Sequence, residues 1–237
     1  MTISEASILL VDDEPDFLEI YTAWLTDAGC KNISSTHDSE HAFAILCDRS
    51  FDLLISDINM PKMDGTVMLR RLSKICRVPN TIFASGFETP DSRELHHLGV
   101  NAFLSKPMRR KDLLSAAQNA LEHRRKCWVN VMLIEPIQSI FLTRDENCRL
   151  EILRPILLGR GGFMAHYSGP LTLGAVSFRC ELPGDEGELK GQGYIRWHSK
   201  TEQRIGIEFA YIEPASRPWV VNGIATAQPQ CFIPGIV

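Results

Sequence analysis

Acidic side chains and one lysine stand directly after short apolar runs in the first half of the chain. Asp12 and Asp13 follow the first run, Asp57 follows the third, Ser85 closes the fourth, and Lys106 follows the fifth. If these runs are parallel strands of one sheet, their carboxyl ends meet at one edge. Carboxylates that converge there repel one another unless a cation is present. A few oxygen ligands with room for water suit Mg²⁺.

This set of residue types can support phosphoryl transfer. Asp57, at the centre, would be a carboxylate nucleophile that forms an aspartyl phosphate. The Lys106 ammonium would hold a phosphoryl oxygen as a point charge, and the Ser85 hydroxyl would contact another oxygen. A single aspartate after a strand is ordinarily a helix cap or turn residue, and a single Lys-Pro is ordinarily a loop. Four such positions at four strand ends are hard to assign to chance.

The elements that must position these residues alternate between two sequence periods. Apolar runs typical of buried strands alternate with segments whose apolar residues recur at helical spacing. The predicted strands are 7–11, 32–36, 52–56, 80–85 and 101–105, and the predicted helices are 16–29, 39–49, 65–75, 91–99 and 110–126. This alternation predicts an α/β doubly wound five-stranded parallel sheet of the flavodoxin type.

The period changes near residue 123. The second half consists of strand-like runs separated by Gly, Pro, Asn and Asp. The predicted strands are 128–133, 138–143, 148–158, 163–167, 175–182, 190–199 and 204–212. These strands predict an all-β antiparallel barrel. We therefore expect two domains, 1–125 and 126–237, the second ending in a tail of about 214–237 without clear periodicity.

Composition and charge exclude several classes of protein. Residues 1–122 carry 12 Lys and Arg against 18 Asp and Glu, and residues 123–237 carry 13 against 11. The second half is therefore not basic enough for a typical DNA-binding domain, and it shows no helix-turn-helix pattern. No apolar run is long enough to span a membrane, and no signal peptide is visible. Seven cysteines without a Cys-x-x-Cys pair suit buried thiols in the cytoplasm.

The motifs of the first half resemble the receiver domain of two-component response regulators. The matching stretches are LLVDDEP, DLLISDINMPKMDG, FAS and LSKP, and the resemblance covers about residues 5–125. It implies that Asp57 accepts a phosphoryl group from a histidine kinase. Asp12 and Asp13 would then organise Mg²⁺ together with Asp57 and the backbone carbonyl of Asn59.

The same resemblance implies how the signal would leave the site. Ser85 would be the switch hydroxyl, Phe103 the switch aromatic residue, and the peptide between Lys106 and Pro107 would be cis. Phosphorylation adds about −1.5 to −2 charge at one point and would reshape the face of the fourth helix, fifth strand and fifth helix. We expect that face to contact a twin subunit, as a homodimer, or the second domain. The protein would be a signalling phosphoacceptor and not an enzyme, beyond self-catalysed phosphoryl transfer and dephosphorylation.

The second half resembles a PilZ domain over roughly residues 127–214. The resemblance is carried by RGGF, LTLG, GYIRW and GIEF. Typical members bind cyclic di-GMP through two arginines four residues apart and a turn of the form Asp/Asn-x-Ser-x-x-Gly. Arginine recognises phosphates and stacks on bases, which explains the choice of residue type.

This chain departs from the PilZ pattern at most of those positions. Gly162 keeps the final glycine, but Leu157 and Gly159 replace the polar turn residues. Arg124 and Arg125 are present without a second arginine four residues later. Since a buried base edge loses about 1–3 kcal/mol per missing polar partner, we expect ordinary cyclic di-GMP binding to be lost. The output would then be contact with a downstream protein. The alternative is a two-input effector in which Arg124, Arg125, Arg160 and Gly162 still bind cyclic di-GMP.

Overall fold

The computed structural model divides the chain into two compact units. The first comprises Met1–Asp91 and Leu98–His123, and the second comprises Ser92–His97 and Arg124–Val237. The structure describes residues 1–75, 78–86, 91–122, 138–142, 156–182, 187–227 and 231–235. The boundary expected at residue 125 and the strand expected at 128–133 lie outside the described residues. None of the described helices is long and apolar enough to cross a membrane.

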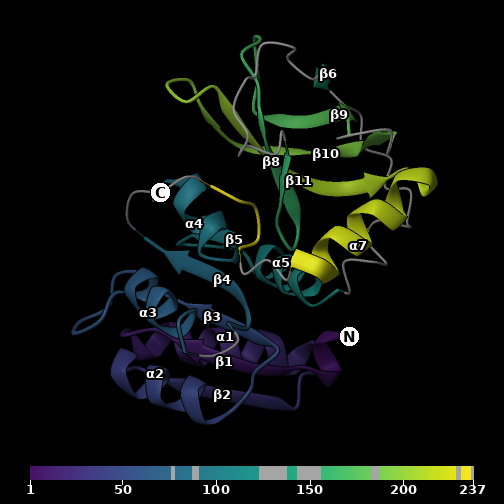
Figure 1. The fold of residues 1–237 in the computed structure, drawn as a ribbon. Helices are drawn as coiled ribbons and strands as arrows, with labels where there is room; N and C mark the ends of the chain where they lie inside the picture. Colours follow the sequence, from purple (N-terminus) through teal and green to yellow (C-terminus); the bar gives the residue numbers. More distant parts are fainter. Residues whose placement is uncertain are drawn as a thin grey trace. The chain divides into compact units, whose positions relative to one another are not determined.

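The first unit contains five strands that alternate with helices (Figure 1). Its strands are β1 (Ser7–Val11), β2 (Asn32–Thr36), β3 (Leu53–Ser56), β4 (Asn80–Ser85) and β5 (Val100–Ser105). Its helices are a short 3-10 helix, η1 (Ile3–Glu5), and α1 (Pro15–Asp27), α2 (Ser39–Asp48), α3 (Gly65–Leu72) and α5 (Arg110–Leu121).

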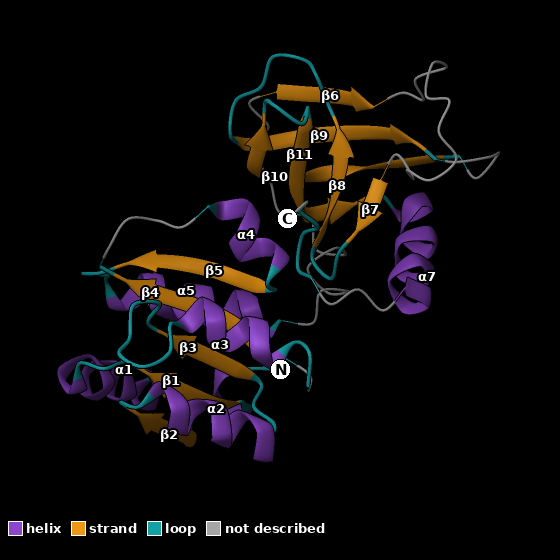
Figure 2. Cartoon of the chain, turned by 60° about the vertical axis from the view of Figure 1, so that its left-hand side comes forward, coloured by secondary structure: helices purple, strands orange, loops and turns teal. Residues whose placement is uncertain are grey.

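All pairings in the first sheet are parallel, and the strand order is β2-β1-β3-β4-β5. Helices α1 and α5 cover one face, while α2 and α3 cover the other (Figure 2). The order of strands reverses beside β1, which places a crevice at the carboxyl ends of β1 and β3. The prediction of a doubly wound five-stranded parallel sheet is confirmed.

The central strands of this sheet are apolar because helices cover both of their faces. All four residues of β3 are buried, and β1 is buried from Ile8 to Val11. Leu25 of α1 and Leu113 of α5 belong to the same core and are fully buried. The strands therefore form a rigid base for the polar residues that follow them.

The second unit is built mainly of strands. They are β6 (Gln138–Leu142), β7 (Ile156–Leu158), β8 (Gly162–His166), β9 (Gly174–Glu181), β10 (Glu188–Ser199) and β11 (Arg204–Ile212), in the sheet order β6-β9-β10-β11-β8-β7. The pairings are antiparallel except that β6 runs parallel to β9. Within the described ranges no pairing joins β6 to β7, so closure of the barrel stays a prediction.

Three phenylalanines form the centre of the second unit's core. The ring centroid of Phe163 lies 5.1 Å from that of Phe178 and 5.5 Å from that of Phe209. Each ring comes from a different strand, β8, β9 and β11 respectively. The aromatic edge-to-face contact between Phe163 and Phe178 adds to the burial of apolar area.

The tail contains helical structure that the sequence analysis did not predict. A 3-10 helix, η2 (Pro214–Ser216), leads into the helix α7 (Arg217–Ala227). Val220 of α7 is fully buried in the core of the second unit. Pro218 in the first turn is compatible with a helix start, because proline lacks a backbone N–H that would be unpaired there anyway. The expectation of an aperiodic tail was wrong for this segment.

One helix belongs to a different unit from its neighbours in the sequence. The helix α4 (Ser92–His97) lies between β4 and β5 in the sequence but groups with the second unit. Its Arg93 makes an ion pair of 2.6 Å with Glu202, which lies between β10 and β11. The chain therefore leaves the first unit after β4 and returns to it before β5.

The Phe163→Ala variant tests the core of the second unit. The Phe163 side chain is fully buried, so its removal should lower the free energy of unfolding by about 3–5 kcal/mol. Chemical denaturation monitors this loss. The matched control is Phe141→Ala, since Phe141 is 48% exposed and its removal should cost far less. Equal losses in the two variants would contradict the packing described.

Candidate functional site

Three carboxylates gather at the carboxyl edge of the first sheet. Asp12 and Asp13 directly follow β1, and Asp57 directly follows β3, its neighbour in the sheet. One oxygen from each of the three lies within 4.8 Å of the others. Asp12 and Asp57 are buried, and Asp13 is partly exposed. The sheet topology thus brings like charges together on the side where solvent can still reach them.

Lys106 supplies the positive charge of the cluster. Its Nζ atom lies 2.7 Å from Oδ2 of Asp57 and 2.8 Å from Oδ2 of Asp12. Glu14 is farther away, at 3.7 Å. Lys106 follows β5, and its peptide bond to Pro107 is cis, as the sequence resemblance implied. The lysine side chain is only 6% exposed, so its ammonium is committed to these carboxylates.

Burial and charge shift the pKa values in the cluster. Burial raises the pKa of Asp12, although the hydrogen bond and charge of Lys106 oppose this rise. Burial also acts to lower the pKa of Lys106, but its hydrogen bonds to Asp12 and Asp57 outweigh that effect, and the pKa is raised. The pKa of Tyr21 is raised by burial and by the negative charges of Asp12 and Asp57. When all three carboxylates are ionised, their negative charge exceeds the single positive charge of Lys106.

Both oxygens of Asp57 accept hydrogen bonds. Oδ1 accepts from the backbone N–H of Asn59 at 3.1 Å, and Oδ2 accepts from Lys106. The Asn59 side-chain amide in turn donates to Oγ of Ser85 at 3.2 Å. Ser85 is buried at the end of β4. Asn59 thus links the central carboxylate to the hydroxyl on the neighbouring strand.

Gly65 fits closely beneath the central aspartate. A Cβ atom at this position would lie 2.5 Å from the carbonyl oxygen of Asp57 and 2.9 Å from the ring of Phe83. The Gly65 N–H also donates to the carbonyl of Ile58 at 2.8 Å. Glycine at the start of α3 therefore lets the loop after β3 fold back tightly against the site.

The chemistry of these donors fits a divalent cation with oxygen ligands. Lys106 donates to Oδ1 of Asp12 at 3.0 Å, and its Nζ atom also lies 2.8 Å from the buried Oδ2. This one ammonium faces three carboxylates, and a divalent cation would balance the remaining negative charge. Mg²⁺ prefers oxygen ligands of this kind and keeps several waters. Asp12, Asp13 and Asp57 could hold such an ion, and the ligand role predicted for the Asn59 carbonyl stays a prediction.

Some contacts of this site were not predicted from the sequence. The Lys106 Nζ atom lies 4.1 Å from the centroid of the Phe17 ring, a distance typical of a cation–π contact. Helical periodicity assigned Phe17 to the core stripe of α1 and gave no sign of this contact. The hydrogen bond from Asn59 to Ser85 was also missed, because it joins side chains 26 residues apart. Phe103, the predicted switch residue, lies half-buried in β5.

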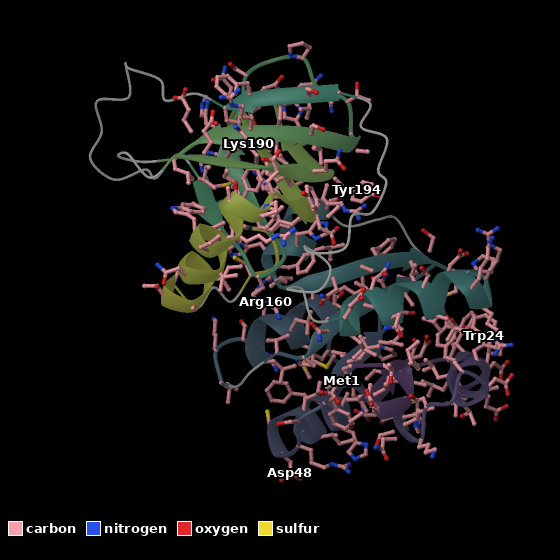
Figure 3. The ribbon with its side chains drawn as sticks, turned by 90° about the vertical axis from the view of Figure 1, so that its right-hand side faces the viewer. Met1, Trp24, Asp48, Arg160, Lys190 and Tyr194 are labelled. Atoms are coloured by element: carbon pink, nitrogen blue, oxygen red, sulfur yellow. The ribbon has the colours of Figure 1, made fainter. Side chains whose placement is uncertain are left out.

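The candidate nucleotide-binding residues of the second unit are only partly described. Arg124 and Arg125 lie outside the described residues. Gly162 begins β8, and its carbonyl accepts a hydrogen bond of 2.8 Å from the N–H of Gly159. Figure 3 labels Arg160 within this turn, away from Lys190 of β10. Gly159–Gly162 is therefore a tight connection between β7 and β8.

Two aromatic residues near this turn belong to the protein interior. Phe163 is fully buried and Trp197 is 4% exposed. Their burial assigns them to the core.

The first half of the chain is similar to known proteins. Residues 8–118 match the family model described as response regulator receiver domain. The transcriptional regulatory protein GlrR of Escherichia coli is 32% identical over 123 residues, which are 52% of this chain and 28% of that protein. Response regulator Rre1 of Synechocystis is 33% identical over 122 residues, which are 50% of this chain and 53% of that protein. The chain thus spans about half the length of these relatives at most.

Solved structures match the same region. A response regulator receiver domain protein from Clostridium thermocellum is 30% identical, with 53% of this chain and 99% of that chain covered and a TM-score of 0.46. The chemotaxis protein CheY4 of Vibrio cholerae is 28% identical, with 49% and 98% covered and a TM-score of 0.45.

Magnesium should stabilise the first unit through the carboxylate cluster. At a Mg²⁺ concentration of about one hundred times Kd, the free energy of unfolding should rise by about 2.7 kcal/mol. Asp13→Asn should remove most of this increase, because it deletes a ligand without removing a partner of Lys106. Thermal unfolding in EDTA and in Mg²⁺ measures the effect, with Glu19→Gln on the exposed side of α1 as control. Equal Mg²⁺ stabilisation in all three proteins would place the ion elsewhere.

Proposed function

We propose that the protein accepts a phosphoryl group on Asp57 from a histidine kinase, because residues 8–118 match the family model of the response regulator receiver domain. The observation that carries this proposal is the position of Asp57. It lies at the centre of the carboxylate cluster, hydrogen-bonded to the Lys106 ammonium at 2.7 Å. No other aspartate among the described residues contacts this lysine except Asp12, which lies on the neighbouring strand end.

The transfer exchanges one bond to phosphorus for another. A carboxylate oxygen of Asp57 attacks the phosphorus of the kinase phosphohistidine, a P–O bond forms, and the P–N bond breaks. The electron pair of that bond returns to the imidazole nitrogen. Lys106 balances negative charge on the phosphoryl oxygens, and its buried position keeps it fixed during the reaction. Bound Mg²⁺ would supply further neutralisation of charge on these oxygens.

A phosphoryl group on Asp57 would offer an acceptor for the hydroxyl of Ser85. Ser85 Oγ now accepts a hydrogen bond from the Asn59 side chain, which lies two residues beyond Asp57. New phosphoryl oxygens on Asp57 would give this hydroxyl a stronger, charged acceptor. The carboxyl end of β4 would then move toward Asp57, and Phe103 on the adjacent strand β5 would adjust its packing.

For the second unit we propose an output through protein contact. The unit resembles a PilZ domain in its motifs, and its strands carry a buried aromatic core. The backbone around Gly159 and Gly161 is covered by the chain's own residues: a Cβ at either glycine would clash with Phe232. This close packing supports a structural role for the turn and argues against a cyclic di-GMP site there. The cytoplasmic location and the downstream protein belong to the same proposal.

The homodimer expected through α4, β5 and α5 also remains a proposal. The residues of α4 already have partners within the second unit, among them Glu202 for Arg93. A twin subunit and the second domain both stay proposed partners of that face.

Asp57→Asn should abolish phosphoryl uptake. The amide is a poor nucleophile but is nearly isosteric, so the fold should be retained. Incubation with acetyl phosphate and Mg²⁺, followed by intact-protein mass spectrometry, measures the added phosphoryl group. Asp64→Asn serves as the control, since Asp64 is the N-cap of α3 and its side chain accepts backbone hydrogen bonds outside the cluster. Equal phosphorylation of Asp57→Asn and the wild type would refute the assignment.

Titration calorimetry with cyclic di-GMP separates the two proposed outputs. We expect no saturable heat at micromolar ligand, because the turn offers leucine and glycine where polar partners are needed. Tight stoichiometric binding that is lost in a variant with Arg124→Ala and Arg125→Ala would instead establish the two-input effector.

A further inference from the structure

A short segment near the end of the chain is held inside the second unit. Residues 231–235, here called the strap, have the sequence Cys-Phe-Ile-Pro-Gly. Phe232 is 1% exposed and Ile233 is fully buried, and both pack with Met164 and Trp197. Figure 1 shows the yellow end of the chain running beside α4. The strap is therefore part of the folded unit.

One side of the strap pairs with the glycine-rich turn. The N–H of Arg160 donates to the carbonyl of Cys231, and the N–H of Gly161 donates to the carbonyl of Phe232, both at 2.9 Å. A Cβ on Gly161 would lie 2.2 Å from the Phe232 ring, and a Cβ on Gly159 would lie 2.5 Å from the Phe232 carbonyl oxygen. Gly159 and Gly161 are thus required because the strap lies directly on them.

The other side of the strap caps the helix α4. The N–H groups of Phe232 and Ile233 donate to the carbonyl of His96 at 3.0 and 3.3 Å, and the His96 ring stacks on Phe232 with centroids 5.8 Å apart. The N–H of Gly235 donates to Nδ1 of His97 at 3.3 Å. Carbonyls at the last turn of a helix have no partner within the helix, and the strap supplies donors for one of them.

The position of α4 in the sequence connects the strap to the phosphorylation site. Ser85, whose hydroxyl would turn toward a phosphoryl group on Asp57, lies seven residues before Ser92, the first residue of α4. Because so few residues separate the two elements in the sequence, a displacement of the end of β4 would reach the helix that the strap caps. Hydrogen bonds are sensitive to such shifts, since they weaken steeply as their geometry departs from linearity.

We propose that residues 231–235 form a latch that joins α4 to the Gly159–Gly162 turn, and that phosphorylation of Asp57 loosens it. The inference rests on the proposed function of Asp57. Loosening exposes Phe232, Ile233 and the backbone N–H groups of Arg160 and Gly161, which are covered in the latched state. Because binding linkage is reciprocal, opening the latch should also favour the phosphorylated state.

Hydrogen–deuterium exchange of the full chain tests the latch. Acetyl phosphate with Mg²⁺ is the phosphoryl donor, and intact mass reports the phosphorylated fraction in the same samples. In phosphorylated wild type, the amides of Phe232 and Ile233 should exchange about tenfold faster, together with amides in α4. Asp57→Asn should show no change on the same treatment.

Two variants should open the latch without phosphorylation of Asp57. Phe232→Ala removes the ring, and Gly161→Ala keeps the ring but introduces a methyl group where it lies. Each variant should speed amide hydrogen exchange in α4 as well as in the strap. Phosphorylation of Asp57 should then have little further effect on that exchange. Leu173→Ala is the control, because Leu173 is 59% exposed in the same unit.

The outcomes distinguish the latch from the proposed function. Phosphorylated wild type with unchanged exchange in the strap and α4 would overturn the latch and leave the phosphoacceptor role standing. Absence of a phosphoryl group on the wild type would overturn that role and the phosphate dependence of the latch. If Gly161→Ala left α4 exchange at the wild-type rate, the strap would not join α4 to the turn.

Discussion

The site depends on one electrostatic contact, between the buried ammonium of Lys106 and the carboxylates of Asp12 and Asp57. The five-stranded sheet places these groups together, because the parallel strands β1, β3 and β5 all end at one edge. One lysine does not balance three carboxylates, and burial raises the pKa of Asp12. The site is thus acidic, and under the proposed function a cation would reduce its charge and phosphorylation would redistribute it.

The second unit uses its glycines for packing. Gly159 and Gly161 have no room for a side chain because Phe232 and its backbone lie against them. In a ligand-binding turn the same closeness would serve a phosphate or a base. Here a segment of the chain itself takes that place, and the same segment caps α4. The helix α4 lies between two strands of the first unit in the sequence, but its last turn is hydrogen-bonded to the strap near the end of the chain.

Much of the first unit could be predicted from the sequence, because strand period, helix period and the residues after each strand agree. Asp12, Asp57 and Lys106 were recognisable since each directly follows an apolar run. The contact of Lys106 with Phe17 could not be recognised, because helical spacing shows only that Phe17 faces inward. Such a contact depends on how α1 rests on the sheet.

The second unit was harder to predict, and the reasons are physical. Its strands were recognised from alternation, but the parallel pairing of β6 with β9 depends on long-range packing that alternation does not encode. The helix α7 was missed because Pro218 and Gly223 are poor helix residues in isolation, while burial of Val220 against the core compensates. The strap was missed because five residues with proline and glycine show no period.

Anomalous diffraction from crystals grown with Mn²⁺ and beryllofluoride would test the central claim most directly. Mn²⁺ replaces Mg²⁺ at oxygen sites, and beryllofluoride imitates a phosphoryl group on aspartate. The account predicts a metal peak within bonding distance of the carboxylates of Asp57 and of Asp12 or Asp13, with beryllofluoride on Asp57 and Lys106 contacting its fluorine atoms. A cluster without metal, or beryllofluoride on another residue, would contradict it.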